Sequence, residues 1–179
     1  ANDVALSETG LQQMARVGTA LRQQTFDRVY TSTLQRTVEA ARIIAPETPA
    51  QAVTGFDEID FGRWEGLTRE EIAERDPQLF QQWQAHPHDF AYPEGDAITD
   101  FRARVVQTFR TLLPHLPSRT LCVVHRGVIA AILTEVLHLT PEERMALPID
   151  LASIYVVVNP GNGWVVETRN AVEHLEGCA

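Results

Sequence analysis

The sequence predicts a layered α/β fold with a mainly parallel sheet and an antiparallel hairpin at one edge. Stretches with the periodicity of amphipathic helices alternate along the chain with short apolar stretches typical of strands. Near the C-terminus, the turn-forming residues 159–163 separate two Val-rich segments, which indicates the hairpin. The 179 residues suit one domain and no repeat or linker divides them, so we expect a single domain over residues 1–179.

Two helices and two strands are expected in the first third of the chain. Ser7 is a good N-cap for the first helix, and residues 26–32 form the first expected strand. A second helix is expected from about Leu34 until Pro46, which cannot continue it, and a second strand over residues 50–54. The predicted apolar face of the first helix consists of Leu11, Met14, Ala15, Gly18 and Leu21.

Polar residues mark the starts of three further helices in the middle of the chain. Thr68 and the following residues up to Glu71 match a T-x-x-E capping box. Asp76 before Pro77 has the pattern of an N-cap followed by proline at the first helical position. After a proline-containing loop over residues 86–95, Asp96 is expected to cap a long helix. The apolar stripe of that helix consists of Phe101, Val105, Phe109 and Leu112.

The last third is expected to supply one more strand, two helices and the hairpin. Residues 120–124 form an unbroken, largely apolar run, as in a strand buried on both faces, and a helix over residues 128–137 follows. Thr140 begins another capped helix. The hairpin strands are expected over residues 154–158 and 164–168.

Composition excludes several functions. The net charge of −9 and the pI near 5.1 argue against a general binder of nucleic acid or of anionic membranes. All 15 basic residues are Arg, so a catalytic lysine is excluded and an anion has to be held by Arg, His or backbone N–H groups. Cys122 and Cys178 form no C-x-x-C motif, and no secretory leader or membrane-length apolar run is visible. We therefore expect a cytoplasmic protein.

Three residues are candidates for chemistry on an anion. His125 ends the apolar run and precedes a helix, where ligands bind in parallel sheets and free N–H groups attract an anion. Arg36 lies in the first turn of a helix, where a cation opposes the helix dipole unless an anion binds both. Glu58 lies among aromatic residues and other carboxylates, which raise a carboxyl pKa and suit a general acid. The alternatives are a structural histidine, a solvated arginine and a solvated acidic loop.

Other site types find less support in the sequence. His86 and His88 are spaced like a pair of metal ligands, but their loop offers no third ligand, so we expect no metal. No Gly-rich phosphate loop and no G-x-S-x-G motif is present. A doubly wound nucleotide-binding domain therefore stays an alternative without a motif.

Five segments of the chain, in order, resemble the histidine phosphatase superfamily, the phosphoglycerate-mutase-like proteins. Each is weak alone, but together they are specific and cover nearly the whole chain. The segments are 6–12, 30–41, 57–66, 93–96 with Arg104 and Val105 after it, and 123–129. The resemblance implies a three-layer α/β/α fold of the phosphoglycerate-mutase type. Among short members, the Phe-Gly-x-Trp-Glu pattern at 61–65 is similar to phosphatases resembling α-ribazole-5′-phosphate phosphatase.

The resemblance also implies roles for the candidate residues. Arg36 corresponds to the phosphate-binding arginine, Glu58 to the acid/base and His125 to the second, phosphate-contacting histidine, with Gly127 beside it at the helix start. The family reaction passes through a phosphohistidine on another histidine and requires no metal or cofactor. The implied partner is a small phosphorylated metabolite, not nucleic acid or a membrane, and a homodimer stays open.

The spacing of the resembling segments favours a phosphatase. Only about 30 residues separate Gly66 from Asp96, whereas mutases of the family usually carry a longer insertion there to enclose a bisphosphate. A phosphoglycerate-mutase-type phosphotransferase stays the alternative.

The sequence departs from the family pattern at its start. It contains no Arg-His-Gly, the family motif that supplies the nucleophilic histidine. The resemblance places this motif upstream of Ala1, at the end of a strand that lies between the strands ending near Ser32 and His125. The predicted function is therefore a metal-independent phosphatase whose nucleophile precedes Ala1. Without that segment, we expect a non-catalytic module that binds a phosphate ligand.

Overall fold

A parallel sheet of three strands lies at the centre of the computed structural model, which describes residues 1–177. Strand β1 (Arg28–Thr31) lies between β2 (Ala50–Ala52) and β3 (Thr120–Val123). A separate antiparallel hairpin consists of β4 (Ile154–Val158) and β5 (Val165–Ala171). All five strands overlap the strands expected from the sequence, and the hairpin has the predicted pairing. Cys178 lies outside the described residues.

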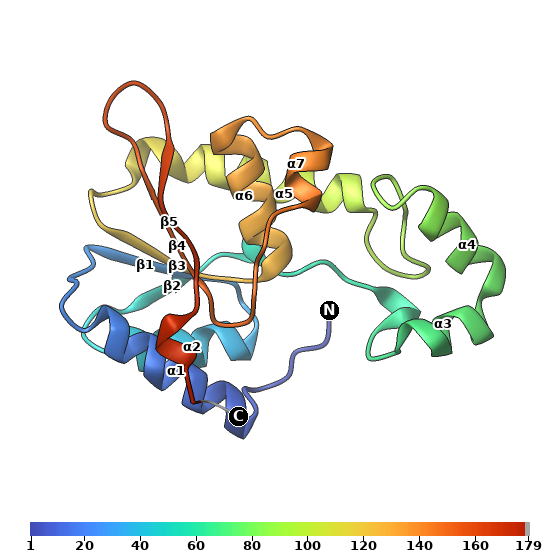
Figure 1. Ribbon diagram of the computed structural model, residues 1–179, viewed down its shortest axis with the longest axis horizontal. Coiled ribbons are helices and arrows are strands. Elements are labelled where there is room, and N and C mark those ends of the chain that lie inside the picture. The colour runs from blue at the N-terminus through green and yellow to red at the C-terminus, as the bar shows by residue number, and fades with distance from the viewer. Residues whose placement is uncertain (178–179) are drawn as a thin grey trace.

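Helices cover both faces of the central sheet, which confirms the predicted three-layer α/β/α architecture (Figure 1). The helices α1 (Glu8–Leu21) and α2 (Gln35–Ile44) lie on one face, and α5 (Ile98–Leu112) and α6 (Arg126–Leu137) lie on the other. The pair α3 (Arg69–Arg75) and α4 (Pro77–Ala85) projects beyond the sheet, and α7 (Pro141–Met145) follows α6. Short 3-10 helices are η1 (Thr54–Phe56), η2 (Gly62–Trp64), η3 (Leu113–His115) and η4 (Glu173–Leu175). Within residues 1–177, no helix has the length and apolar character needed to cross a membrane.

The helix starts confirm the predicted N-cap positions Ser7, Thr68, Asp76 and Thr140, and correct the one at Asp96. The Ser7 side chain accepts the Gly10 N–H, and complete capping boxes form at Thr68 with Glu71 and at Thr140 with Glu143. Asp76 does occupy the predicted N-cap position before Pro77, but its side chain makes no cap hydrogen bond. Asp96 is not the N-cap of α5, because Ala97 occupies that position. The Asp76 carboxylate binds Arg63 and the Trp64 indole instead, and the Asp96 carboxylate accepts the Asp60 N–H and faces Arg104. Partners far along the chain therefore outcompete the local cap at these two positions.

An aromatic cluster attaches α3 and α4 to the rest of the molecule. Trp64 stacks on Phe90 with 5.2 Å between ring centroids, and Tyr92 and Trp83 meet Trp64 edge-on. Trp64 and Phe90 are buried in the main core, which continues under α5 and α6. The cluster thereby fixes the chain on both sides of η2, close to the segment that carries Glu58.

The strand β3 differs in two ways from the sequence expectation. It is half-buried rather than buried on both faces, and the Cys122 side chain in it is exposed. In addition, β1 pairs directly with β3 along its whole length, from Arg28 opposite Thr120 to Thr31 opposite Val123. No further strand therefore fits between the strands that end near Ser32 and His125, and the expected position of a missing strand is wrong.

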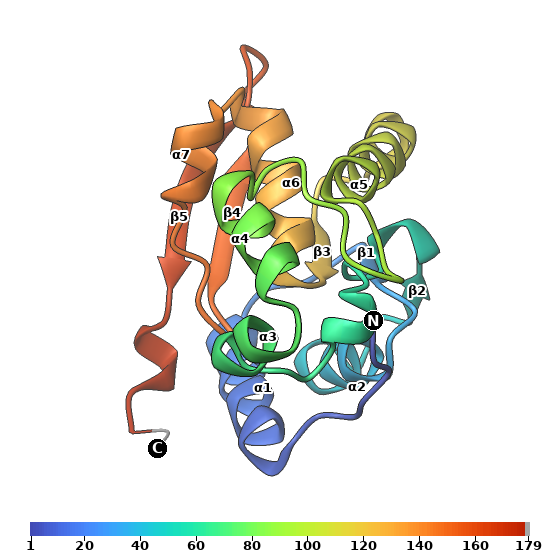
Figure 2. The same ribbon diagram turned by 90° about the vertical axis from the view of Figure 1, so that its right-hand side faces the viewer.

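The unpaired strand edges lie elsewhere in the fold. Both edges of β1 are used by β2 and β3, whereas β3 and β4 each have one edge without a strand partner among residues 1–177. Across the molecule the strands follow the order β5, β4, β3, β1, β2, so that the free edges of β3 and β4 are neighbours (Figure 2). Half-buried apolar strands with free edges are incomplete as sheet elements, because an unpaired edge leaves backbone N–H and C=O groups without partners.

Candidate active site

The predicted site residues His125 and Arg36 follow the carboxyl ends of two neighbouring strands. Ser32 comes directly after β1 and His125 comes two residues after β3, where its extended backbone begins α6. Both side chains are buried, and His125 Nε2 lies 2.8 Å from Ser32 Oγ. The pairing of β1 with β3 therefore brings together two residues that are 93 positions apart in the sequence.

The hydrogen bonds around Ser32 define which nitrogen of His125 carries a proton. Thr37 Oγ1 donates its one hydrogen to the Leu34 carbonyl at 2.9 Å, so the 2.7 Å contact between Thr37 and Ser32 requires the Ser32 hydroxyl to donate. Ser32 Oγ then accepts from the Leu34 N–H and from His125 Nε2–H. Burial is the main reason why the pKa of His125 is lowered to about 4, with the Arg36 charge adding to it. Near neutral pH, His125 is therefore neutral with a bare Nδ1.

Arg36 lies in the first turn of α2, a turn without an acidic side chain or a side-chain cap. Its side chain is half-buried, and Nη1 donates to the Asn2 carbonyl at 2.9 Å. The N-terminal stretch also supplies Asp3, whose Oδ1 accepts the Gln35 N–H at the same helix end. The Arg36 charge lowers the pKa of both His125 and Glu58, so its guanidinium lies within electrostatic reach of both.

Glu58 lies between η1 and η2, and its carboxylate reaches the start of α6. Oε1 accepts the Ile59 N–H at 3.0 Å, and Oε2 accepts the Gly127 N–H at 3.1 Å. Burial raises the pKa of this carboxyl, and the two N–H groups and the charges of Arg36 and Arg104 offset only part of that increase. A carboxyl with a raised pKa retains its proton at higher pH, as a general acid requires.

Gly127 was expected to take part in phosphate binding at the start of α6, but in the structure it contacts Glu58. Its N–H is occupied by Glu58 and is not free for an anion. A Cβ atom at this position would overlap Glu58 Oε1 and would lie 3.0 Å from Phe101 Cζ. The absence of a side chain at Gly127 is therefore what allows Glu58 to approach the N-terminus of α6.

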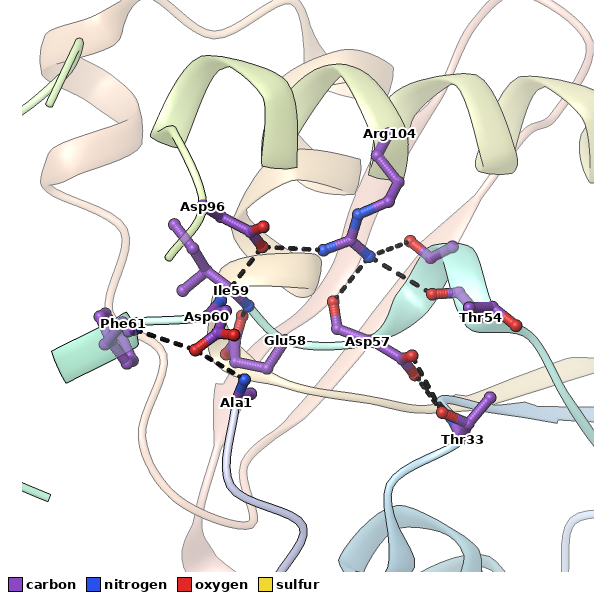
Figure 3. A network of polar contacts seen from close by, with 12 residues as sticks. Ala1, Thr33, Thr54, Asp57, Glu58, Ile59, Asp60, Phe61, Asp96 and Arg104 are labelled. Atoms are coloured by element: carbon purple, nitrogen blue, oxygen red, sulfur yellow. Dashed lines mark hydrogen bonds and ion pairs between the residues drawn. The ribbon is translucent and has the colours of Figure 1, made fainter. Parts of the chain in front are cut away.

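Two polar side chains, those of Arg104 and Asp57, hold the segment that carries Glu58 (Figure 3). Arg104 Nη1 donates to the carbonyls of Thr54, Gly55 and Asp57, and Nη2 lies 3.4 Å from Asp96. The Asp57 carboxylate accepts the N–H of Thr33 at 2.7 Å and its hydroxyl at 2.8 Å. Since Thr33 lies between Ser32 and the start of α2, this contact ties the Glu58 segment to the turn that leads into the helix carrying Arg36.

Ser32, Thr33 and Asp57 are site residues that the sequence pattern did not single out. Ser32 and Thr33 had one available signal, because they are polar residues at the end of a predicted strand. The partner of Asp57 could not be read from the sequence, since the two residues lie 24 positions apart.

A pocket of about 250 Å³ opens beside these residues. It is lined by Arg36, Glu58, Ile59, Phe61, Glu65 and Gly66, together with Ala1, Asn2 and Val4 of the N-terminal stretch. His125 is not among the residues that line this pocket, and its Nε2 contacts Ser32. Arg36 and Glu58 thus face one cavity, at which the described chain starts.

A metal site at His86 and His88 finds no further ligands in the structure. Across residues 1–177, no three His, Cys, Asp or Glu side chains group as metal ligands. His88 Nδ1 instead lies 3.1 Å from Arg144 Nη2.

Comparison with protein families gives a match over nearly the whole chain. The family model described as "Histidine phosphatase superfamily (branch 1)" matches residues 1–172. Phosphoserine phosphatase 1 of Hydrogenobacter thermophilus is 31% identical over 105 residues, which cover 58% of this chain and 50% of that protein. The 6-phosphofructo-2-kinase/fructose-2,6-bisphosphatase of Gallus gallus is 27% identical over 168 residues, 93% of this chain and 35% of that protein. The chain thus spans half or less of the length of these two relatives.

Solved structures agree with the fold class. A putative alpha-ribazole-5'-P phosphatase from Escherichia coli has a TM-score of 0.88 at 21% identity and covers 95% of this chain and 85% of its own. Bacillus stearothermophilus YhfR has a TM-score of 0.84 at 25% identity and covers 97% of this chain and 88% of its own. These similarities confirm the predicted phosphoglycerate-mutase-like fold.

Proposed function

Because the chain belongs to branch 1 of the histidine phosphatase superfamily, we propose that it is a metal-independent phosphatase acting on a small phosphomonoester. The observation that carries the proposal is the approach of Arg36, Glu58 and His125 to one another at the carboxyl ends of β1 and β3. A half-buried guanidinium beside a protonatable carboxyl suits a reaction in which a dianion is bound and an alkoxide leaves. The phosphatases among the relatives and structural neighbours support the same class.

Each of the three side chains has a proposed part in the reaction. Arg36 binds the phosphoryl oxygens, because its half-buried guanidinium side chain lines the same pocket as Glu58. Glu58 donates a proton to the leaving oxygen, which its raised pKa favours. His125 approaches the phosphate with Nδ1, because Nε2–H is engaged by Ser32. A bound dianion raises the pKa of His125, so we expect phosphate binding to be accompanied by proton uptake at Nδ1.

The nucleophile is proposed to lie on a segment that precedes Ala1. Two structural features support this proposal. Ala1 and Asn2 line the pocket, so a segment that preceded them would enter at the site itself. One additional strand could pair with β3 on one side and with β4 on the other, because their free edges are neighbours. If that strand ran parallel to β1 and β3, it would end at the same edge of the sheet as they do. A histidine at the end of that strand would attack phosphorus, and water would then release phosphate from the phosphohistidine.

Phosphate release from p-nitrophenyl phosphate by the full-length protein tests the proposed function. We expect turnover that persists in EDTA and is inhibited by orthovanadate. After rapid quenching of the reaction, we expect acid-labile phosphate on one histidine, located by mass spectrometry. Activity that depends on an added divalent metal contradicts the phosphohistidine mechanism. Saturable phosphate binding without turnover identifies a phosphate-binding module instead.

A further inference from the structure

Arg102 on α5 and Arg144 on α7 form no ion pair with an acidic side chain in the described part of the chain. Of the fifteen arginines, only Arg36, Arg102, Arg104 and Arg144 are partly buried, and the others are exposed. Arg36 belongs to the candidate active site, and Arg104 is satisfied by Asp96 and three carbonyl groups. For Arg102 and Arg144, the described part of the chain supplies no carboxylate within 4 Å.

Both side chains contact His88, in the loop between α4 and α5. Arg102 Nη1 donates to the His88 carbonyl at 3.3 Å, and Arg144 Nη2 donates to His88 Nδ1 at 3.1 Å. Since arginine has no acceptor, Nδ1 carries no proton, and the ring of neutral His88 therefore has its N–H at Nε2. These contacts hold two guanidinium groups next to each other with several donors still unused.

The electrostatics of this cluster are unfavourable without an anion. Burial lowers the pKa of both arginines, and the charge of Arg144 lowers that of Arg102 further, so the two cations repel each other. The acidic residues that raise the pKa values of these arginines act without a direct ion pair, Asp89 on Arg102 and Glu142 on Arg144. The repulsion between two partly desolvated cations that contact the same residue destabilises this part of the fold. An oxyanion bound between the two guanidinium groups would offset the repulsion.

A separate cavity of about 120 Å³ adjoins the two arginines. Its lining residues come from α5, α6, the end of α6 and α7. It is lined by Arg102, Val106, Ala131, Thr134, Glu135, His138 and Arg144, and it shares no residue with the active-site pocket. The one carboxylate in the lining, Glu135, is neutralised by Arg110, whose Nε donates to Oε1 at 2.7 Å. The cavity thus carries the positive charges of Arg102 and Arg144 without a carboxylate to compensate them.

We propose that Arg102 and Arg144 form a second anion-binding site, which takes a small oxyanion such as a phosphate or carboxylate group. The two guanidinium groups supply the charge and paired N–H donors that recognise two oxygens of one anion. The size of the cavity suits a single phosphate or carboxylate group rather than a nucleotide. This site stands independently of the proposed phosphatase activity, because none of its residues lines the active-site pocket.

NMR titration of the full-length protein with inorganic phosphate tests the second site. The arginine Nε–Hε signals are recorded for the wild type and for the variants Arg36→Ala, Arg102→Ala and Arg144→Ala. We expect the signals of Arg102 and Arg144 to shift saturably with one common Kd, which Arg36→Ala leaves unchanged. Removing either Arg102 or Arg144 should weaken this binding about 10- to 150-fold, the effect of one lost charge-assisted hydrogen bond. Acetate, titrated in the same way, distinguishes a site for any oxyanion from a site for phosphate alone.

Matched variants keep the test decisive. Arg119→Ala removes an exposed arginine and should leave the titration unchanged. If Arg144→Ala does not fold, Arg144→Lys takes its place in the test. This variant keeps the charge but loses the paired donors, so it should retain part of the affinity. Shifts of Arg102 and Arg144 that disappear in Arg36→Ala would assign all phosphate binding to the active site and overturn the proposal. Shifts that do not saturate with either anion would also overturn it.

Discussion

Replacing Gly127 by alanine tests whether the start of α6 positions the acid of the reaction. The added Cβ would overlap Glu58 Oε1 and approach the Phe101 ring, so the carboxyl has to move and loses the Gly127 N–H. A hydrogen bond from N–H to a charged group contributes about 1.5–3 kcal/mol. If this bond holds Glu58 in place for proton donation, its loss should lower kcat about 10- to 150-fold. Loss of the N–H also raises the pKa of Glu58, because this bond is one of the contacts that lower it.

The assay is phosphate release from p-nitrophenyl phosphate by the full-length protein over a range of pH. Gly10→Ala is the matched control, since its Cβ would lie 3.2 Å from the flexible end of Leu6 and 3.4 Å from Ser7 Oγ, outside the site. We expect this control to keep the wild-type kcat. A Gly127→Ala variant that folds and retains the wild-type kcat would refute the positioning of Glu58 by α6. Equal losses in both variants would also refute it.

Three further predictions concern the anion and His125. Arg36→Ala should weaken phosphate binding, measured by calorimetry, about 10- to 150-fold. Arg42 lies on the exposed side of the same helix, so Arg42→Ala should leave the affinity unchanged. Equal affinities of the two variants would exclude Arg36 from the site. The pKa of His125 is lowered from 6.5 to about 4, so the folded state binds fewer protons than the unfolded state between these values. The free energy of unfolding should therefore fall by about 3 kcal/mol from this group as the pH drops from 7 to 4, and urea denaturation of His125→Gln should lack that component. A variant with the same pH dependence as the wild type would contradict the lowered pKa. Ser32→Ala should lower the free energy of unfolding by about 1–3 kcal/mol, because it leaves the buried His125 Nε2–H without its acceptor. A ¹⁵N spectrum of the wild-type imidazole that shows the proton on Nδ1 would contradict the assigned hydrogen bond.

Local chemistry explains why much of the fold could be predicted from the sequence. The capping boxes at Thr68 and Thr140 form from residues within one turn of each other, so their pattern is complete in the sequence. Arg36 and His125 could be singled out because each follows a predicted strand and lies at a helix start. Glu58 could be singled out from its aromatic and acidic neighbours, although its contact with Gly127 could not.

The features that the sequence did not predict depend on distant partners. Asp76 and Asp96 have the local pattern of N-caps, but ion pairs and hydrogen bonds with residues beyond the helix occupy them. The apolar run 120–124 predicts a strand but not how many neighbours the strand has, and β3 proves half-buried with one free edge. The contact between Ser32 and His125 requires the register of β1 against β3, which hydrophobic pattern alone does not determine.

A crystal structure of the full-length protein with orthovanadate tests the central claim most directly. We predict vanadate in the pocket beside Glu58, with the Arg36 guanidinium and His125 Nδ1 within hydrogen-bond distance of its oxygens. We also predict that a strand preceding Ala1 pairs with the free edges of β3 and β4. Vanadate bound away from Arg36, or an Arg36 side chain that points out of the pocket in that complex, would contradict the account.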